Sequence, residues 1–430
     1  MANWKKIGAG AGAIAAVAAI GAGTLAYETL ETSRSDVADD NVTLATFEAV
    51  PEAAERGEYV MRMGDCAACH TRGQGEMAGG YEIETPFGKL VSSNITPDTE
   101  TGIGNMTERD FFNALRQGIG QHGLLYPAMP YTAYAKLTDA DMHDLWAYMS
   151  TVEPVQNDID ENAGMPFPFN IRLAMAGWDM LFFKNEGFDG DPVADRGRYI
   201  VDGAGHCSAC HSPRNILGAE QGGAYLHGAN VDGWHAPDIT SNAAMGVGGT
   251  SAEDLARYLG TGTDGVAVAS GPMAEAVQHS LQYLTVDDRL AMANYLLSVE
   301  DSGAERTAPA KMADAAELAY EVNCSACHGL NGEGIVNAVP AFKGNNALLA
   351  DPSSLIHVML SGARAPYTEG ARTAAGMPSF AWKMDDAQIA SVLDYVRNSW
   401  GNQAEAIAPA KVGQMRETLG ASQPISALPE

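Results

Sequence analysis

Apolar residues near the C-terminal end of the chain recur three or four positions apart, which is the spacing of one face of an α-helix. These positions are Ile389, Val392, Leu393 and Val396. Residues 138–141 and 285–288 each form a Ser/Thr-x-x-Asp capping box, which is typical of a helix N-terminus. A tyrosine lies near the end of each helix-like stretch, at Tyr148, Tyr295 and Tyr395. The pattern predicts three similar units, each ending in a helix.

Helix-like stretches also open these units. Residues 56–59 are Arg-Gly-Glu-Tyr and residues 196–199 are Arg-Gly-Arg-Tyr, whereas Ala-Glu-Leu-Ala-Tyr stands at residues 316–320. We therefore expect an all-α fold of three tandem domains. They span residues 50–155, 191–300 and 313–402.

The segments between and after the units are rich in Pro, Gly, Asn or Ala. Residues 156–190 and 301–312 are predicted to be linkers. Within the first linker, residues 165–169 and 178–183 are too apolar for a free tether, so we expect it to pack on a neighbouring domain or on a partner. Residues 403–430 have no sustained period, and we expect a tail that is disordered or laid over a partner.

The N-terminal segment has a run of 21 uncharged residues at positions 7–27, preceded by Lys5 and Lys6 and followed by acidic residues from Glu28 onward. A membrane-spanning helix needs about 20 apolar residues and keeps its basic flank inside. The apolar region of a signal peptide is shorter, about 7–15 residues. We therefore expect residues 1–30 to be an uncleaved transmembrane anchor, with the rest of the chain exported. A signal peptide cleaved after Ala26 is the alternative.

The chain is strongly acidic, with 54 Asp and Glu against 26 Lys and Arg and a formal net charge of −28. Such a surface repels nucleic acid, which needs basic groups to neutralise its phosphates. It also disfavours docking on anionic lipid head groups. It suits a partner with a positive docking face, because complementary fields steer association. General solubility would explain the charge as well.

All six cysteines lie in three copies of the motif C-x-x-C-H, which attaches c-type haem. The copies are Cys66, Cys69 and His70; Cys207, Cys210 and His211; and Cys324, Cys327 and His328. A zinc site needs four ligands, whereas each motif supplies only three. Neither a redox pair of cysteines nor a disulfide explains the histidine that follows each second cysteine. The motifs predict three covalent haems c, each with iron bound by its histidine. Since c-type haem is attached outside the cytoplasm, we expect the haem domains on the periplasmic side of a bacterial inner membrane.

Each haem iron needs a second axial ligand, and a methionine beside a proline follows each motif. The candidates are Met129, Met273 and Met377, which lie 59, 62 and 49 residues after their histidines. Met/His ligation is typical of electron carriers, because the thioether raises the potential. Met245 is the alternative to Met273. The expected fold is thus three class I cytochrome c-like domains plus an N-terminal transmembrane helix.

Two further predictions concern residues around the motifs. Pro340 follows His328 by 12 residues, and its carbonyl is expected to accept the imidazole N–H and orient the ligand. His206, beside the second motif, is expected to be structural, because His211 already occupies that side of the iron. The chain has no G-x-S-x-G elbow, no P-loop and no dinucleotide-binding glycine motif after a strand. We therefore expect no catalytic residues.

Several stretches carry a family resemblance. They are residues 85–88, 94–98, 101–104, 125–130, 205–215 and 377–402. The chain resembles the triheme cytochrome c subunit of bacterial membrane-bound dehydrogenases that oxidise alcohols, aldehydes, gluconate or related sugars at the periplasmic face. The likeness spans about residues 55–402, whereas the N-terminal anchor is not general in that family.

The resemblance implies that the chain is not an enzyme on its own. A separate catalytic subunit, with a pyrroloquinoline quinone, flavin or molybdopterin centre, would oxidise the substrate, and a small third subunit can accompany it. Electrons would then pass through the haems to ubiquinone or a terminal oxidase. Alcohol or aldehyde is the slightly favoured substrate.

Two other functions stay open. The chain could be a free-standing or oxidase-linked multihaem carrier without a dehydrogenase partner. It could instead be a haem enzyme with one open iron, and the second unit is where such an iron would be sought.

Overall fold

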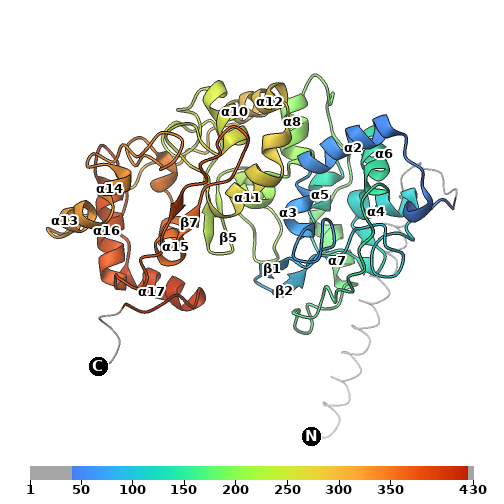
Figure 1. Cartoon of the computed structure of the whole chain (residues 1–430), viewed down its shortest axis with the longest axis horizontal. Helices are drawn as coiled ribbons and strands as arrows, with labels where there is room; N and C mark the ends of the chain where they lie inside the picture. Colours follow the sequence, from blue (N-terminus) through green and yellow to red (C-terminus); the bar gives the residue numbers. More distant parts are fainter. Residues whose placement is uncertain (1–40, 425–430) are drawn as a thin grey trace, which may run out of the picture. The chain divides into compact units, whose positions relative to one another are not determined.

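The structure, a computed structural model, describes residues 41–424, and the chain divides into two units, residues 1–194 and residues 195–430 (Figure 1). The division into three domains expected from the repeats stays a prediction. The first unit contains η1 (Leu44–Thr46), α2 (Pro51–Met63), α3 (Cys66–His70), β1 (Glu82–Thr85), β2 (Gly88–Val91), α4 (Glu108–Gln117), β3 (Ile119–Gly120), β4 (Gly123–Leu124), α5 (Tyr131–Tyr134), α6 (Asp139–Met149) and α7 (Ala174–Phe182).

The second unit contains two successive groups of elements. The first group is α8 (Arg196–Tyr199), η2 (Ile200–Ala204), α9 (Ser208–His211), η3 (Gly222–Ala224), β5 (Ala229–Val231), β6 (Trp234–Ala236), α10 (Ala252–Thr261), α11 (Gly271–His279), η4 (Leu281–Tyr283) and α12 (Val286–Leu296). The second group is α13 (Ala316–Asn323), α14 (Ser325–His328), η5 (Asn346–Leu348), α15 (Ser353–Ser361), β7 (Ala363–Arg364), β8 (Gly376–Met377), α16 (Asp386–Asn398) and α17 (Pro409–Thr418).

Helices α2 and α6 of the first unit cross at a glycine. A Cβ on Gly57 would lie 1.8 Å from the carbonyl oxygen of Asp144, so only glycine allows this approach. The neighbouring Arg56 donates to both carboxylate oxygens of Asp144, from Nε at 2.7 Å and from Nη2 at 2.6 Å. The side chain of Thr138 accepts the amide N–H of Asp141, which confirms the predicted cap of α6.

The same crossing recurs between α8 and α12 in the second unit. A Cβ on Gly197 would lie 2.0 Å from the carbonyl oxygen of Ala291. Arg196 donates to both carboxylate oxygens of Asp288, at 2.9 and 2.8 Å, and Thr285 caps α12 as predicted. The repeated Arg-Gly sequence therefore encodes a helix crossing closed by a bidentate ion pair.

The third repeat packs α13 against α16 around Tyr320, whose side chain is fully buried. The apolar stripe predicted on α16 faces this core, since Ile389, Val392, Leu393 and Val396 are all buried. The segment after residue 402 differs from the expected tail, because residues 409–418 form α17, and Val412 of this helix joins the same core. Its apolar period was too short to detect in the sequence.

The prediction of an all-α fold is wrong. Within residues 41–424, helices make up only 39% of the chain, and eight short strands pair as four antiparallel two-stranded sheets, β1–β2, β3–β4, β5–β6 and β7–β8. The longest pairs Glu82 with Val91 through Thr85 with Gly88. These strands have two to four residues, which is too short for an alternating apolar pattern to show in the sequence.

The predicted membrane anchor is also corrected. Within residues 41–424, no helix is both long enough and apolar enough to cross a bilayer. The run at residues 7–27, for which the transmembrane helix was expected, lies outside the described residues. The transmembrane helix and the inner-membrane localisation that depended on it are therefore not retained.

The segment at residues 156–190 lies on the first unit. The amide of Lys89 on β2 donates to the carbonyl of Gly164 at 3.0 Å. The hydroxyl of Tyr126 donates to the carbonyl of Phe169 at 2.8 Å. Helix α7 packs against β3 and β4 through Ala176, which is fully buried. These contacts hold the segment against β2 and the β3–β4 hairpin of the first unit.

Candidate haem-binding sites

Each C-x-x-C-H motif folds into a single helical turn, in α3, α9 and α14. The first cysteine and the histidine are four residues apart, so they lie on the same face of that turn. The amide of His211 donates to the carbonyl of Cys207, and that of His328 to the carbonyl of Cys324, each at 2.9 Å. Local helix geometry thus places the first cysteine and the histidine of each motif next to each other.

The imidazole of each motif histidine contacts a backbone carbonyl through Nδ1. The three contacts are His70 to Ser93 at 2.7 Å, His211 to Pro237 at 2.7 Å and His328 to Pro340 at 3.2 Å. A carbonyl only accepts, so Nδ1 carries the hydrogen and Nε2 keeps its lone pair for a metal. Hydrogen bonds of this kind fix the tautomer and orientation of a ligating histidine.

The predicted contact between the Pro340 carbonyl and His328 is confirmed, whereas the contacts of the Ser93 and Pro237 carbonyls were missed. The three carbonyls follow their histidines by 23, 26 and 12 residues. No residue type marks them, because every residue has a carbonyl. Only the similar distance of all three contacts reveals the common arrangement.

The motif histidines are neutral in this setting. Burial lowers the pKa of all three imidazoles, and the carbonyl contact opposes that shift only partly. His70 and His328 are 9% and 7% exposed. Neutral imidazole is the form that binds iron, so these side chains fit the proximal ligand of a haem.

None of the six cysteines forms a disulfide. Burial raises the pKa of Cys66 and Cys207 to about 12 and that of Cys324 to about 11. Burial therefore favours the protonated thiols at neutral pH. Paired thiols beside a neutral histidine fit covalent attachment of haem c.

Met129 lies in the loop between β4 and α5. Its amide donates to the carbonyl of Tyr126 at 3.0 Å, and its carbonyl accepts from the amide of Tyr131 at 2.8 Å. Helix α5 then reaches the first motif, because the hydroxyl of Tyr134 donates to the carbonyl of Gly64 at 2.7 Å. The structure therefore ties the Met129 loop to the turn that begins at Cys66.

Met273 lies in the first turn of α11 rather than in a loop. Gly271, two residues earlier, has φ +56° and packs against the indole of Trp234, where a Cβ would lie 2.6 Å from the ring. Trp234 is three residues before Pro237, the residue whose carbonyl contacts His211. The hairpin β5–β6 thus connects the Met273 helix to the second motif.

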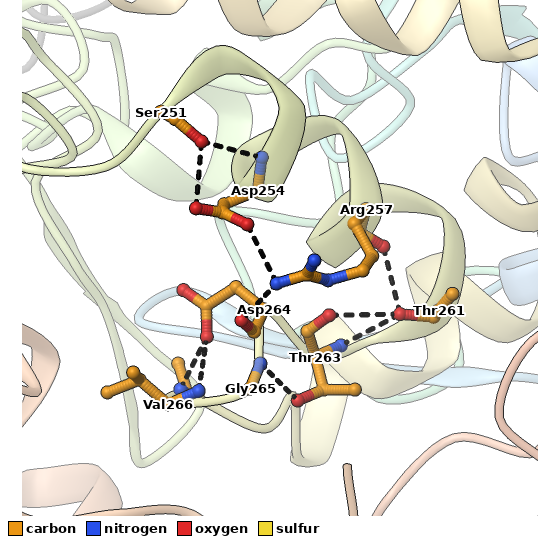
Figure 2. Close-up of polar contacts among 9 residues, drawn as sticks. Ser251, Asp254, Arg257, Thr261, Thr263, Asp264, Gly265 and Val266 are labelled. Carbon is orange, nitrogen blue, oxygen red and sulfur yellow. Dashed lines mark hydrogen bonds and ion pairs between the residues drawn. The ribbon is translucent and has the colours of Figure 1, made fainter. Parts of the chain in front are cut away.

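Figure 2 shows the polar network that fixes the chain between α10 and α11. Arg257 forms an ion pair with Asp254 at 2.8 Å and also donates to the carbonyl of Asp264. The carboxylate of Asp264 accepts from the amide of Val266 at 2.8 Å, and Thr263 accepts from the amide of Gly265 at 3.0 Å. This network fixes the loop that follows α10 and leads toward the Met273 helix.

Met377 lies on β8 and pairs with Ala363 of β7. Gly362, with φ +78°, lets the chain pass close to the Met377 carbonyl, where a Cβ would lie 2.7 Å from its oxygen. Met377 and Cys324 both pack against the core of the third repeat. The third methionine and its motif therefore border one apolar cluster.

Met245, the alternative to Met273, occupies a different environment. It is 8% exposed and belongs to the core formed by Tyr320, Ile356 and Met359 of the third repeat. His206 has φ +36° and forms part of the turn before the second motif, where its carbonyl accepts from the amide of Ala209 at 2.8 Å. Both placements suit structural roles.

Comparisons with known proteins identify the families that this chain resembles. The cytochrome c family matches residues 312–400, and the family of cytochrome c oxidase, cbb3-type, subunit III matches residues 52–149. The chain is 39% identical over 413 residues to the gluconate 2-dehydrogenase cytochrome c subunit of Pantoea cypripedii, covering 88% of this chain and 93% of the relative.

Two other relatives have similar names. One is the cytochrome c subunit of alcohol dehydrogenase (quinone) from Gluconobacter oxydans (strain 621H), with 38% identity over 85% of this chain and 82% of the relative. The other is the fructose dehydrogenase cytochrome subunit of Gluconobacter japonicus, with 39% identity over 88% of this chain and 87% of the relative.

These matches confirm the resemblance found in the sequence. The relatives are cytochrome subunits and not catalytic subunits, so this chain binds haem c and transfers electrons within a dehydrogenase complex without being an enzyme on its own. The three motif turns, their oriented histidines and identities of 38–39% over most of the chain show that it belongs to the family of cytochrome c subunits of gluconate, alcohol and fructose dehydrogenases.

Proposed function

We propose that this chain passes electrons through three covalent haems c, from the catalytic subunit of a periplasmic dehydrogenase to ubiquinone or a terminal oxidase. The observation that carries the proposal is the contact between the Nδ1 of a motif histidine and a backbone carbonyl, which occurs three times. A single such contact would suit one haem. Its repetition at every C-x-x-C-H motif supports three.

Each haem is assigned one motif and one methionine. The first haem takes Cys66, Cys69, His70 and Met129; the second takes Cys207, Cys210, His211 and Met273; and the third takes Cys324, Cys327, His328 and Met377. Haem iron with His and Met ligands exchanges single electrons at a raised potential. Within this proposal the protein holds each histidine neutral and oriented, and it fixes the methionine-bearing segment.

An alcohol or aldehyde is the proposed substrate of the catalytic subunit, and gluconate or a sugar is the alternative. Three relatives with 36–38% identity are named cytochrome c subunits of alcohol dehydrogenase (quinone), which supports both this substrate class and a quinone acceptor. The net charge of −28 suits a catalytic subunit with a positive docking face.

Haem counting tests the number of haems. The chain is produced in cells that attach c-type haem, and haem per chain is measured by pyridine haemochrome absorbance and by intact mass. We expect three haems in the native chain and two after both cysteines of one motif are replaced by serine. Two haems in the native chain would contradict the proposal.

Carbon monoxide binding tests the axial assignment. If every iron has a His and a Met ligand, the ferrous protein binds carbon monoxide poorly at all haems. Stoichiometric binding at one haem would show an open iron and would favour a haem enzyme. The spectral change on exposure to carbon monoxide is the measurement.

Co-purification tests the partner and its substrate. We expect the native chain, isolated under mild conditions, to retain a large dehydrogenase subunit, and we expect ethanol or an aldehyde to reduce the haems. Reduction by gluconate or fructose alone would replace the proposed substrate class. A chain isolated without any dehydrogenase would favour a free-standing carrier.

A further inference from the structure

One carboxyl group of the first unit is buried without full hydrogen bonding. Asp179 lies on α7, and its side chain is 2% exposed. The hydroxyl of Tyr131 donates to its Oδ1 at 2.6 Å. Its Oδ2 is also buried and accepts no hydrogen bond. A buried carboxylate with only one donor is poorly stabilised, whereas a carboxylic acid needs fewer donors.

The surroundings of Asp179 are largely apolar. Ile119 and Leu124 of the β3–β4 hairpin pack with Ala176 of α7, and all three are buried. The ring of Phe183 meets the ring of Tyr131 edge-on, with centroids 5.3 Å apart. Little in this environment compensates a negative charge.

Charged and titratable groups on the neighbouring elements have other partners or face solvent. Arg172, just before α7, pairs with Glu161 and donates to the carbonyl of Leu124. Arg116, at the end of α4, pairs with Asp139 on α6. His122, between β3 and β4, and Lys184, after α7, are exposed. Glu108, Arg109 and Asp110 lie in the first turn of α4. The hydroxyls of Tyr126 and Tyr134 donate to the carbonyls of Phe169 and Gly64.

Burial raises the pKa of Asp179 to about 6, although the hydrogen bond from Tyr131 opposes the shift. Burial raises the pKa of Tyr131 as well, so the phenol keeps its proton and stays a donor. The carboxyl group therefore changes its protonation within the mildly acidic range.

Tyr131 connects this carboxyl to the first haem site. It follows the assigned ligand Met129 by two residues, and its amide donates to the Met129 carbonyl at 2.8 Å. The side chain of Tyr131 is fully buried, and its ring packs against Gly118. A Cβ added to Gly118 would lie 2.9 Å from this ring. The hydroxyl that donates to Asp179 and the amide that donates to the Met129 carbonyl thus belong to the same buried residue, Tyr131.

We infer that Asp179 takes up a proton when the first haem is reduced and releases it when that haem is oxidised. This inference rests on the proposed function, since it assumes a haem bound by His70 and Met129. In the coupled step, one electron from a reductant converts ferric haem to ferrous haem. One proton from water converts the Asp179 carboxylate to a carboxylic acid. The proton offsets negative charge that the electron adds to the site.

The physical cause is electrostatic linkage. Reduction adds negative charge to the haem, and negative charge disfavours ionisation of a carboxyl group in an environment of low dielectric constant such as that of Asp179. By reciprocity, ionisation of Asp179 makes reduction harder by the same factor. The midpoint potential of the first haem should therefore fall as the pH rises. A tenfold difference in carboxyl acidity between the redox states corresponds to a total fall of about 59 mV for one electron.

The experiment is a redox titration of the haem-loaded chain from pH 5 to pH 8, followed by haem absorbance. The first haem is identified as the one whose potential changes in a Met129→His variant. We expect its potential to fall with pH around pH 6 in the native chain, and the slope in this range to be lost in Asp179→Asn. The control Glu186→Gln removes an exposed carboxyl from the segment after α7 and should keep the native slope.

A second variant keeps the inference testable if Asp179→Asn fails to fold. Tyr131→Phe removes the one donor to the carboxylate, so it should move the sloping region to higher pH. An unchanged slope in Asp179→Asn, or an unmoved slope in Tyr131→Phe, would overturn the inference. Absence of a haem at Cys66 and Cys69 would instead overturn the proposed function, and haem counting detects that separately.

Discussion

The guanidinium of Arg416 lies beside the carboxylate of Asp386, with Nε 2.8 Å from Oδ1. Arg416 is 2% exposed and sits on α17, whereas Asp386 begins α16. Its other nitrogens donate to the carbonyls of Ala381 and Met384, at 2.9 Å each, and of Ser422 at 2.6 Å. One buried cation therefore joins the C-terminal helix to the start of the last helix of the third repeat.

Replacing this arginine should loosen the C-terminal helix. Arg416→Ala leaves Asp386 and three carbonyls without their donor, so we expect the free energy of unfolding to fall by about 2–4 kcal/mol. Urea unfolding measures the loss, and limited proteolysis should release residues beyond 402. The control Arg372→Ala changes an exposed arginine and should alter neither result. Equal stability of the two variants would contradict the role of Arg416.

A methyl group at the first helix crossing should be strongly unfavourable. Gly57→Ala places its Cβ 1.8 Å from the Asp144 carbonyl oxygen, so α2 and α6 must separate, at a cost of about 1–3 kcal/mol or more. Gly177→Ala is the matched control, because this glycine lies within α7 and a Cβ there meets no atom within 4 Å. It should stabilise the chain by about 0.5–1 kcal/mol. Thermal unfolding measures the change in stability of each variant, and we expect the two changes to have opposite signs.

Acid should weaken the contact between α17 and the segment just before α15. Burial alone would raise the pKa of Asp351, but hydrogen bonds from Lys411 and Ser353 outweigh it and lower the pKa to about 2. A carboxyl with a lowered native pKa stabilises the fold above its unfolded pKa, and this contribution is lost as the pH falls from about 4 to about 2.

The variant Asp351→Asn should therefore be less stable at neutral pH by about 1 kcal/mol, allowing for solvent screening of a partly exposed pair. The difference from the native chain should vanish near pH 2. Urea midpoints measured from pH 2 to pH 7 test this, and Asp314→Asn, which changes an exposed carboxyl, serves as the control. A difference that persists at pH 2 would assign the effect to packing.

The two methionines considered for the second haem should respond in opposite ways. Met273→Ala should remove an iron ligand, so the ferrous protein should bind carbon monoxide at one haem with little change in stability. Met245→Ala should keep the haem spectrum and lower the free energy of unfolding by about 2–5 kcal/mol, since Met245 is buried in the core of the third repeat. If the spectral change follows Met245 instead, the axial assignment moves to that residue.

Local features of the fold were largely predictable. The caps at Thr138 and Thr285, and the apolar stripe on α16, depend on residues within one or two turns of each other, and the structure has them as expected. The short strands and α17 were not predictable. Segments of two to four residues show no period, and α17 is held by Arg416 through contacts 30 or more residues away in sequence.

The haem sites likewise combine features that could be predicted from the sequence with features that could not. The three motifs alone predict where haem would be attached, because both cysteines and the histidine must lie within one helical turn to reach a single porphyrin. The tertiary fold was needed to show that the carbonyls of Ser93 and Pro237 contact His70 and His211, that Met245 belongs to a core and that Asp179 is buried beside Tyr131. These features depend on which distant segments meet, and backbone carbonyls and buried side chains leave no local signal of their partners.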